Sequence, residues 1–303
     1  MSAGTGPVRV ALASSVRTLP RGAGLAYEPK FDGHRLVVVR TAQDVVLQAR
    51  SGRIVTAAFP DLAAAARQLP AGTVLDGEVV VWHAGRTDFA LVQRRAAAAT
   101  AARAAVLAQT LPASYAAFDV LELAGLDVRA RPYERRRALL VDLLLPLGPP
   151  LQPVPMTTDP ELAETWYETL PASGIEGLVV KRLDQAYPAG RRGWRKLRHT
   201  DVRDAAAVGY TGTPRRPVAL VLVLPGEEDE PPLVSSPLAA ALRAELANAV
   251  AARTETAPGG GTVTAIGFGE VPFRPLDPPL AAEVRHSSAR HPPPEVLRLR
   301  TDL

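Results

Sequence analysis

Short runs of apolar and β-branched residues recur from residue 25 to the end of the chain, and glycine-containing turns separate many of them. Such runs are typical of strands, so β-sheets must form much of the fold. Up to about residue 200 these runs alternate with helical segments, whereas beyond it a single helical stretch at 237–252 interrupts them. This change predicts two domains, 1–203 and 204–303, which suits a chain of 303 residues.

The first domain is expected to be α+β, with residues 25–28 and 35–39 forming two strands around a turn at 32–33. Further strands are predicted at 45–48, 73–75, 78–82, 115–121, 178–181 and 194–198, and helices at 60–68, 88–109 (one or two), 132–145 and 160–170, the last with Asp159 as its N-cap. In the second domain, strands at 206–210, 218–224 and 262–268 predict a small β-barrel. Proline-rich patches such as 292–294 predict loops or linkers.

The chain contains no cysteine, which excludes disulfides, thiolate chemistry and cysteine-based zinc sites. It has neither an apolar run long enough to span a membrane nor a signal-peptide pattern, so we expect a cytosolic protein. The net charge of +4 suits a polyanionic partner, although a solvated basic surface explains it equally well. Because no patch for self-association is evident, we expect a monomer.

Lysine is rare among the basic residues. Only Lys30, Lys181 and Lys196 are lysines among the 35 basic side chains, and the bias toward arginine, alanine and proline is typical of a GC-rich coding background. Arginine stays protonated and therefore does not serve as an amine nucleophile, whereas lysine does so when its pKa is lowered. The three lysines are therefore candidates for positions where arginine would not function.

Lys30 stands immediately before the turn formed by Asp32 and Gly33, and Glu28 lies two residues upstream. Because side chains alternate along a strand, Glu28 and Lys30 are expected to share a face. Glycine at the turn lets the chain reverse close to a ligand. Taken alone, this segment also fits an exposed hairpin with mixed charges.

Two acidic and two basic positions stand out further along the chain. Glu78 and Glu176 each lie at the edge of an apolar strand, where a carboxylate can hold a hard cation or a ribose hydroxyl. Lys196 and Arg198 alternate in a short strand and would present two cations to an anion. Each feature by itself also fits an ordinary strand end or a basic surface strand.

Together these residues meet the needs of a lysine that attacks the α-phosphate of a nucleotide. The amine must lose its proton, and neighbouring cations such as Lys196 and Arg198 favour this loss. Cations must also neutralise the charge on the phosphate oxygens in the transition state. Glu176 is a candidate Mg²⁺ ligand, and Phe118 is a candidate for stacking on a base.

The ordered motifs resemble those of the covalent nucleotidyltransferases, which comprise ATP-dependent DNA ligases, RNA ligases and mRNA capping enzymes. They are Glu-x-Lys-x-Asp-Gly-x-Arg from residue 28, Asp-Gly-Glu from 76, Phe-Asp from 118, Glu-Gly-Leu-Val-Val-Lys from 176 and Trp-x-Lys-x-Arg from 194. Within this group the chain most resembles small bacterial ATP-dependent DNA ligases of the repair and end-joining type. The resemblance implies an ATP-grasp-like nucleotidyltransferase (adenylation) domain followed by a C-terminal OB-fold β-barrel.

The resemblance also implies a role for each matching position. Lys30 would be the catalytic nucleophile that carries AMP. The implied nucleotide-binding positions are Glu28 at the adenine edge, Arg35 at the ribose or a phosphate, Glu78 at the ribose or the metal, Phe118 on the adenine face, Lys181 without a defined contact, and Lys196 and Arg198 at the α-phosphate and pyrophosphate. The remaining implied positions are Glu176 and Glu78 as metal ligands, Arg50 at the 5′-phosphate of a nick, and Arg300 and Asp302 in closure of the OB domain over ATP.

This sequence departs from the family pattern at three places. Ala49 and Ser51 flank Arg50 where relatives usually have serine and asparagine, so two side chains near the nick are lost. Arg198 stands where many relatives have lysine. The last motif usually ends in lysine, whereas here Leu303 is the final residue, which bears on closure of the OB domain.

The function implied is that of an ATP-dependent DNA ligase, which seals nicks with a 5′-phosphate and a 3′-hydroxyl through a lysyl-AMP intermediate. Its cofactors would be ATP and Mg²⁺, with Mn²⁺ as an alternative. Its partner would be nicked double-stranded DNA and, in DNA repair, recombination or end joining, an end-binding repair protein; no membrane is involved. An RNA ligase or a GTP-using capping enzyme is the alternative within the superfamily, and a non-catalytic nucleic-acid-binding relative is the alternative without chemistry.

Overall fold

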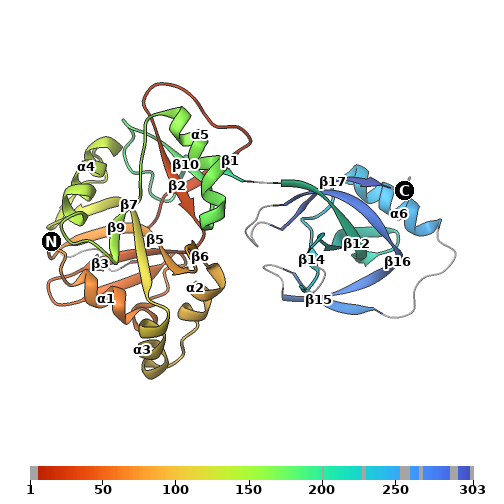
Figure 1. Cartoon of the computed structure of the whole chain (residues 1–303), viewed down its shortest axis with the longest axis horizontal. Coiled ribbons are helices and arrows are strands. Elements are labelled where there is room, and N and C mark those ends of the chain that lie inside the picture. Colours follow the sequence, from red (N-terminus) through yellow and green to blue (C-terminus); the bar gives the residue numbers. More distant parts are fainter. Residues whose placement is uncertain are drawn as a thin grey trace. The chain divides into compact units, whose positions relative to one another are not determined.

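The computed structural model of the chain describes residues 6–199, 201–226, 230–252, 260–265, 269–286 and 293–300. The chain forms two compact units, Met1–Arg198 and His199–Leu303 (Figure 1). The units therefore divide after Arg198 rather than after residue 203, because strand β12 (Asp201–Thr213) belongs as a whole to the second unit. No helix in the described ranges is long and apolar enough to span a membrane.

A seven-stranded sheet forms the centre of the first unit, with the order β4-β3-β5-β7-β8 and with β6 and β9 added beside β5 and β7. Its strands are β3 (His34–Arg40), β4 (Val45–Ala49), β5 (Thr73–His83), β6 (Arg86–Thr87), β7 (Ala113–Leu123), β8 (Leu126–Asp127) and β9 (Leu151–Pro153). Helices α1 (Pro60–Ala66) and α4 (Tyr133–Leu144) bury Leu62 and Leu140 against one face of this sheet.

The other helices of this unit are η1 (Thr56–Ala58), α2 (Phe89–Ala96), α3 (Ala101–Thr110), α5 (Pro160–Thr169) and η2 (Leu170–Ser173). Side chains cap the start of three of them, α2, α3 and α5. The helical stretch predicted at 88–109 is two helices, because the Thr100 side chain accepts the Arg103 N–H and begins a second one. The predicted start of α5 is confirmed, since Asp159 accepts backbone N–H groups of its first turn.

A smaller sheet has the order β1-β11-β10-β2. Its strands are β1 (Leu12–Val16), β2 (Leu25–Phe31), β10 (Ile175–Arg182) and β11 (Arg192–Arg198), of which β1 was not predicted. One face, with Leu178, packs against Ala163 of α5. The opposite face, with Trp194, packs against Val37 and Val74 of the large sheet. Polar residues on this second face are therefore brought between the two sheets.

In its described residues, the second unit consists of a six-stranded sheet and one helix. Its elements are β12 (Asp201–Thr213), β13 (Arg216–Val223), β14 (Leu233–Val234), α6 (Ala240–Ala251), β15 (Gly261–Ala265), β16 (Gly269–His286) and β17 (Glu295–Arg300). The sheet order is β14-β13-β12-β16-β15, and β17 pairs with β16. The end strands β14 and β15 contact each other, so the sheet curls into a barrel. Helix α6, predicted at 237–252, packs Leu246 and Val250 into the barrel core.

One prediction of local structure was wrong. Asp76 and Gly77 do not form a turn between two strands but lie inside the continuous strand β5. Asp76 pairs with Val37 of β3, and the space above Gly77 is filled by the Tyr115 ring, which lies 2.5 Å from where a Cβ would be. An Asp-Gly pair favours a turn locally, but the neighbouring strands and the buried carboxylate hold it extended.

Strand β16 was not predicted, because its proline-rich sequence argues against a strand. The ladder between β12 and β16 skips from Leu280 to Pro275, so Pro278 and Pro279 lie in a bulge where no ladder N–H is needed. The strand predicted at 262–268 is observed as β15 up to Ala265, and its last three positions lie outside the described residues.

Candidate functional site

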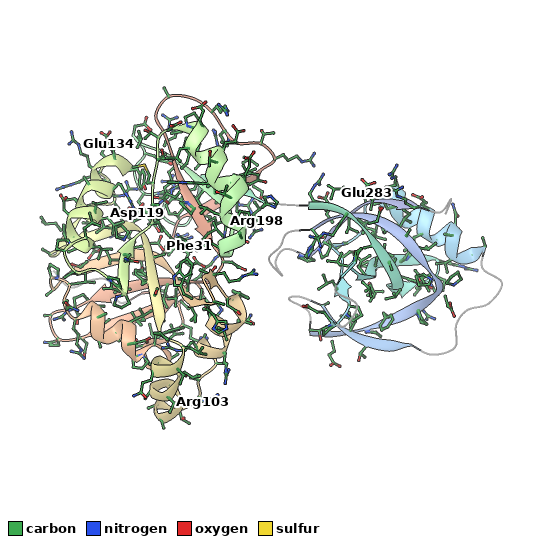
Figure 2. All side chains as sticks on the ribbon, viewed as in Figure 1. Phe31, Arg103, Asp119, Glu134, Arg198 and Glu283 are labelled. Atoms are coloured by element: carbon green, nitrogen blue, oxygen red, sulfur yellow. The ribbon has the colours of Figure 1, made fainter. Side chains whose placement is uncertain are left out.

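Three neighbouring strands of the small sheet bring Lys30 to a carboxylate and a second cation. Gly177 of β10 pairs with Lys30 of β2 on one side and with Arg198 of β11 on the other. The Lys30 amine forms an ion pair with Glu176 Oε1, and Arg198 Nε lies 3.4 Å from Glu176 Oε2. The Glu176 side chain is only 4% exposed, whereas those of Lys30 and Arg198 are 21% and 22% exposed. Solvent therefore reaches this cluster at Lys30 and at Arg198, which is labelled in Figure 2.

Glycine at position 177 is required for this arrangement. The residue has a φ of +146°, and a Cβ there would lie 2.0 Å from the carbonyl oxygen of Leu197. The ladder with β2 shifts register between Ile175 and Gly177. Such a bulge re-aims the adjoining side chain, and here it turns Glu176 toward Lys30.

Alternation along the strands collects further charged residues on the same face. Glu28 and Lys196 both pair with Val179, one from β2 and the other from β11. Val179 packs toward the large sheet, so its two partners face the same way. Burial lowers the pKa of Lys196, and the charges of Arg198 and Lys30 lower it further. This geometry agrees with the expectation that Lys196 and Arg198 lie close to Lys30.

The large sheet places carboxylates opposite these cations. Glu78 of β5 pairs with Arg35 of β3, and burial raises the pKa of Glu78 to about 7 against the opposing effect of Lys30 and Arg35. Asp32 in the turn after β2 also has a pKa raised to about 6, first by burial and then by the charge of Glu176. The sequence marked Asp32 only as a turn residue, so its electrostatic position was missed.

Gly33 allows the turn between β2 and β3 to lie close to β5. A Cβ on Gly33 would be 2.1 Å from the carbonyl oxygen of Val79 and 3.0 Å from Cγ of Glu78. The expected close approach at this glycine is therefore an approach to the neighbouring strand. It brings the Lys30 segment against the strand that carries Glu78.

Arg35 is held inside the protein by other groups. Its Nε and Nη2 donate to the two carboxylate oxygens of Asp76 at 3.0 and 2.6 Å, and Nη1 donates to the Ala11 carbonyl at 2.6 Å. Tyr187 also donates to Asp76. With these donors engaged, the guanidinium lies 5.2 Å from the centre of the Phe118 ring. Its implied contact with the ribose or a phosphate is a prediction that this geometry does not favour.

Phe118 occupies a bulge in β7. Asp76 pairs with Asp119 and Gly77 with Ala117, so the ladder skips Phe118. The Phe118 ring makes an edge-to-face contact with Trp194, with 5.7 Å between ring centroids. Asp119, in the next position, is buried and accepts two hydrogen bonds from Arg136 at 2.7 and 2.9 Å (Figure 2). This ion pair anchors the bulge that sets the direction of Phe118.

Lys181 lies with Glu28 rather than with Lys196 and Arg198. Its Nζ is 2.7 Å from Glu28 Oε2 and donates to the Phe118 carbonyl at 2.7 Å. The Tyr133 hydroxyl donates to Glu28 Oε1. The side chains of Lys181 and Glu28 are only 1% and 2% exposed. Tyr133 was missed, since its sequence signal is no more than an aromatic residue at the start of a helix.

The remaining predicted residues lie outside this group. Arg50 is exposed after β4, and its charge contributes to lowering the pKa of Lys196. In the second unit, Arg300 Nη2 lies 3.3 Å from Asp204 and 3.6 Å from Glu283. Asp302 falls outside the described residues.

The donor set around Lys30 fits a hard metal ion that shares its ligands with a phosphate. Within the described ranges, no three His, Cys, Asp or Glu side chains are grouped to hold a metal ion by themselves. Mg²⁺ is usually held by one or two carboxylates together with water and substrate phosphates, which Glu176 and Glu78 match. Arg198 Nε is buried and has no hydrogen-bond partner in the part of the chain that is described, which suits an anion at this place.

Comparisons with known proteins match the first unit, which carries this site, to a known family. Residues 10–198 match the family described as ATP dependent DNA ligase domain. The chain is 38% identical over 205 residues to DNA ligase C2 of Mycolicibacterium smegmatis, a match that covers 67% of this chain and 57% of that protein. It is 36% identical over 209 residues to DNA ligase C of Mycobacterium tuberculosis, which covers 67% of this chain and 58% of that protein.

The solved structure titled mycobacterial DNA ligase D complexed with ATP and MES is similar over nearly the whole chain. It covers 98% of this chain and 96% of that chain, with 25% identity and a TM-score of 0.55. The α+β unit followed by a β-barrel is thus the arrangement of adenylation and OB-fold domains in these ligases. The chain spans less than three fifths of the length of the two curated relatives. Because the family match includes every motif from Glu28 to Arg198, the chain belongs to the ATP-dependent DNA ligase family.

Proposed function

We propose that this chain is an ATP-dependent DNA ligase that seals a 5′-phosphate to a 3′-hydroxyl through a lysyl-AMP intermediate on Lys30. The observation that carries the proposal is the position of the Lys30 amine. It is paired with Glu176, it lies beside Arg198, and its charge acts on Lys196 and Glu78. A partly exposed amine among cations and carboxylates is what nucleotide transfer to lysine requires.

In the first step the neutral Lys30 Nζ attacks the α-phosphorus of ATP. A P–N bond forms, the bond from the α-phosphorus to the oxygen bridging the α- and β-phosphates breaks, pyrophosphate leaves, and the Lys30 nitrogen releases a proton to solvent. We assign Lys196 and Arg198 to the α-phosphate and the departing pyrophosphate, since both are cationic hydrogen-bond donors close to Lys30. Their charges oppose the negative charge that develops on the phosphate oxygens.

In the second step an oxygen of the nick's 5′-phosphate attacks the same phosphorus and the P–N bond breaks. The nitrogen takes up a proton from solvent, which regenerates the Lys30 amine as AMP moves to the DNA. In the third step the 3′-hydroxyl attacks the 5′-phosphorus, loses its proton and displaces AMP. We assign Arg50, which is exposed beside this site, to the 5′-phosphate of the nick. Arg300 is proposed to act in closure of the OB domain over ATP, together with Asp302.

A Mg²⁺ ion, or Mn²⁺ in its place, would be held by Glu176 and Glu78, and when bound would neutralise charge on the phosphate oxygens. Glu78 serves this purpose only when ionised, and burial raises its pKa to about 7. Glu28 is assigned to the adenine edge and Phe118 to the adenine face. Arg35, held in place by Asp76, contacts the Phe118 ring and is proposed to support it.

The proposed substrate is nicked double-stranded DNA, and the proposed location is the bacterial cytoplasm. Phosphate contacts from a basic surface make binding weaker as the salt concentration rises. Roles in DNA repair, recombination and end joining are proposed from the resemblance to mycobacterial ligases C and D. An end-binding repair protein is a candidate partner for the last of these, and the chain is proposed to act as a monomer.

The direct test is transfer of label from α-³²P-ATP to the protein with Mg²⁺, followed by sealing of a nicked duplex. The wild type should become labelled, and Lys30→Arg should not, although it keeps a cation for Glu176. Parallel reactions with labelled GTP, and with nicks that carry an RNA strand, distinguish a capping enzyme or an RNA ligase. Binding of nicked duplex without any label on the wild type would refute the proposal in favour of a non-catalytic relative.

A further inference from the structure

Lys181 is a buried cation that the reaction at Lys30 does not use. Its Nζ lies 4.4 Å from the centre of the Trp194 ring, 4.5 Å from that of Tyr133 and 5.1 Å from that of Phe118. Three aromatic rings and one carboxylate thus surround the ammonium group. Only 1% of the Lys181 side chain is exposed, and its Nζ is engaged by Glu28 and by the Phe118 carbonyl.

The hydrogen bonds of Lys181 join two segments that are far apart in sequence. One goes to the carboxylate of Glu28 on β2, and the other to the main-chain carbonyl of Phe118 at the bulge of β7. The Tyr133 hydroxyl at the start of α4 donates to the other oxygen of the Glu28 carboxylate. Each Glu28 oxygen is therefore held by one donor of a different element and keeps a lone pair for a further one.

A carboxylate fixed in this way accepts hydrogen bonds and donates none. The 6-amino group of adenine is a donor, whereas the 6-oxo group of guanine or hypoxanthine is an acceptor and would be repelled. A site that is built to bind a particular N–H rejects analogues that lack it much more strongly than an apolar pocket does. Such discrimination needs a carboxylate whose orientation is fixed.

We propose that Tyr133 and Lys181 are positioning residues that hold Glu28 beside Phe118 as a reader of the adenine 6-amino group, and so set the preference for ATP. The inference rests on the proposed function, because Glu28 and Phe118 are placed at the adenine by that proposal. Lys181 binds one oxygen of the Glu28 carboxylate and also the Phe118 carbonyl, so it ties the reader of the base edge to the residue that covers the base face. Tyr133 fixes the orientation of the carboxylate.

The main variant is Tyr133→Phe, which removes the hydroxyl and keeps the ring beside Lys181. The matched control is Tyr115→Phe, which also removes a buried hydroxyl, one that donates to the Leu36 carbonyl at 2.9 Å in the core of the large sheet. The ligands are ATP, ITP and purine riboside 5′-triphosphate, which lacks any 6-substituent. Dissociation constants are measured on the full chain by equilibrium dialysis without Mg²⁺, so the measurement does not depend on transfer to Lys30.

The wild type should bind ATP more tightly than either analogue. Tyr133→Phe should weaken ATP binding about tenfold while leaving purine riboside triphosphate nearly unchanged, because one hydrogen bond to a charged group is lost. In the transfer reaction with Mg²⁺, the same variant should raise the KM for ATP with little change in kcat. Tyr115→Phe should keep the wild-type ratio of ATP to analogue binding.

A double-mutant cycle tests whether Tyr133 acts through Glu28. Glu28→Gln should remove most of the discrimination, and adding Tyr133→Phe should then change the ratio by less than about twofold. An unchanged ratio in Tyr133→Phe, an equal loss in Tyr115→Phe, or independent effects in the cycle would each overturn the inference. Absence of label on the wild type would instead overturn the proposed ligase function, so the two failures are distinguishable.

Discussion

Replacing Glu78 by glutamine should make the protein more stable at neutral and alkaline pH. Glu78 is a partly buried carboxylate on β5 whose pKa is raised to about 7, chiefly by burial, from an ordinary value of 4.5. The folded state therefore binds the proton more tightly than the unfolded state does. Above pH 7 the side chain is ionised in both states, and its charge opposes folding.

The magnitude follows from these pKa values. Each tenfold difference in proton affinity corresponds to about 1.36 kcal/mol, so the ionised side chain costs the folded protein at most about 3 kcal/mol at pH 8. Because Glu78 keeps some contact with solvent, we expect about 2 kcal/mol. The cost disappears as the pH falls from 7 toward 4.5, where the carboxyl is protonated in the folded state. Glutamine carries no charge, so the gain should be present at pH 8 and nearly absent at pH 5.

The assay is urea unfolding of the wild type and Glu78→Gln at both pH values, followed by circular dichroism. The control is Glu134→Gln on α4, whose side chain is 55% exposed and which should change the free energy of unfolding by less than about 0.5 kcal/mol (Figure 2). A gain of equal size at pH 8 and pH 5, or a loss at pH 8, would refute the reasoning. The same variant should transfer AMP to Lys30 more slowly, since the amide lacks the negative charge assigned to the metal site.

Three further predictions concern the groups around the site. Lys30→Arg should keep the wild-type free energy of unfolding within about 0.5 kcal/mol, because the ion pair to Glu176 survives. Its labelling by α-³²P-ATP should fall below detection, and measurable labelling would contradict the assignment of the nucleophile. Gly33→Ala should destabilise the first unit by about 1–3 kcal/mol in urea, since the added Cβ would lie 2.1 Å from a backbone carbonyl of β5, and a neutral effect would contradict this packing. Arg136→Met should cost about 3–5 kcal/mol by leaving Asp119 buried without a partner, which thermal and urea unfolding can measure; a loss below about 1 kcal/mol would show that the pair is dispensable.

Much of the first unit follows from local sequence. Short-range chemistry specifies several elements that were predicted. A side-chain acceptor specifies the cap at Asp159, a glycine the turn after Lys30, and a periodic apolar stripe helix α6 of the second unit. Strand β16 and the continuous strand β5 were not predicted. Both contain residues whose local preference is for turns or loops, and only pairing with neighbouring strands holds them extended.

For the site, the sequence alone indicated the chemistry, since a lysine retained in an arginine-rich chain and the ordered motifs pointed to Lys30. It also indicated which carboxylates and cations accompany this residue. Only the tertiary structure decided which of these side chains bind one another: Arg35 is engaged by Asp76, and Lys181 is buried with Glu28 and Tyr133. The reason is physical, because identity and spacing determine what a side chain can do, whereas burial and strand register determine which partner it reaches.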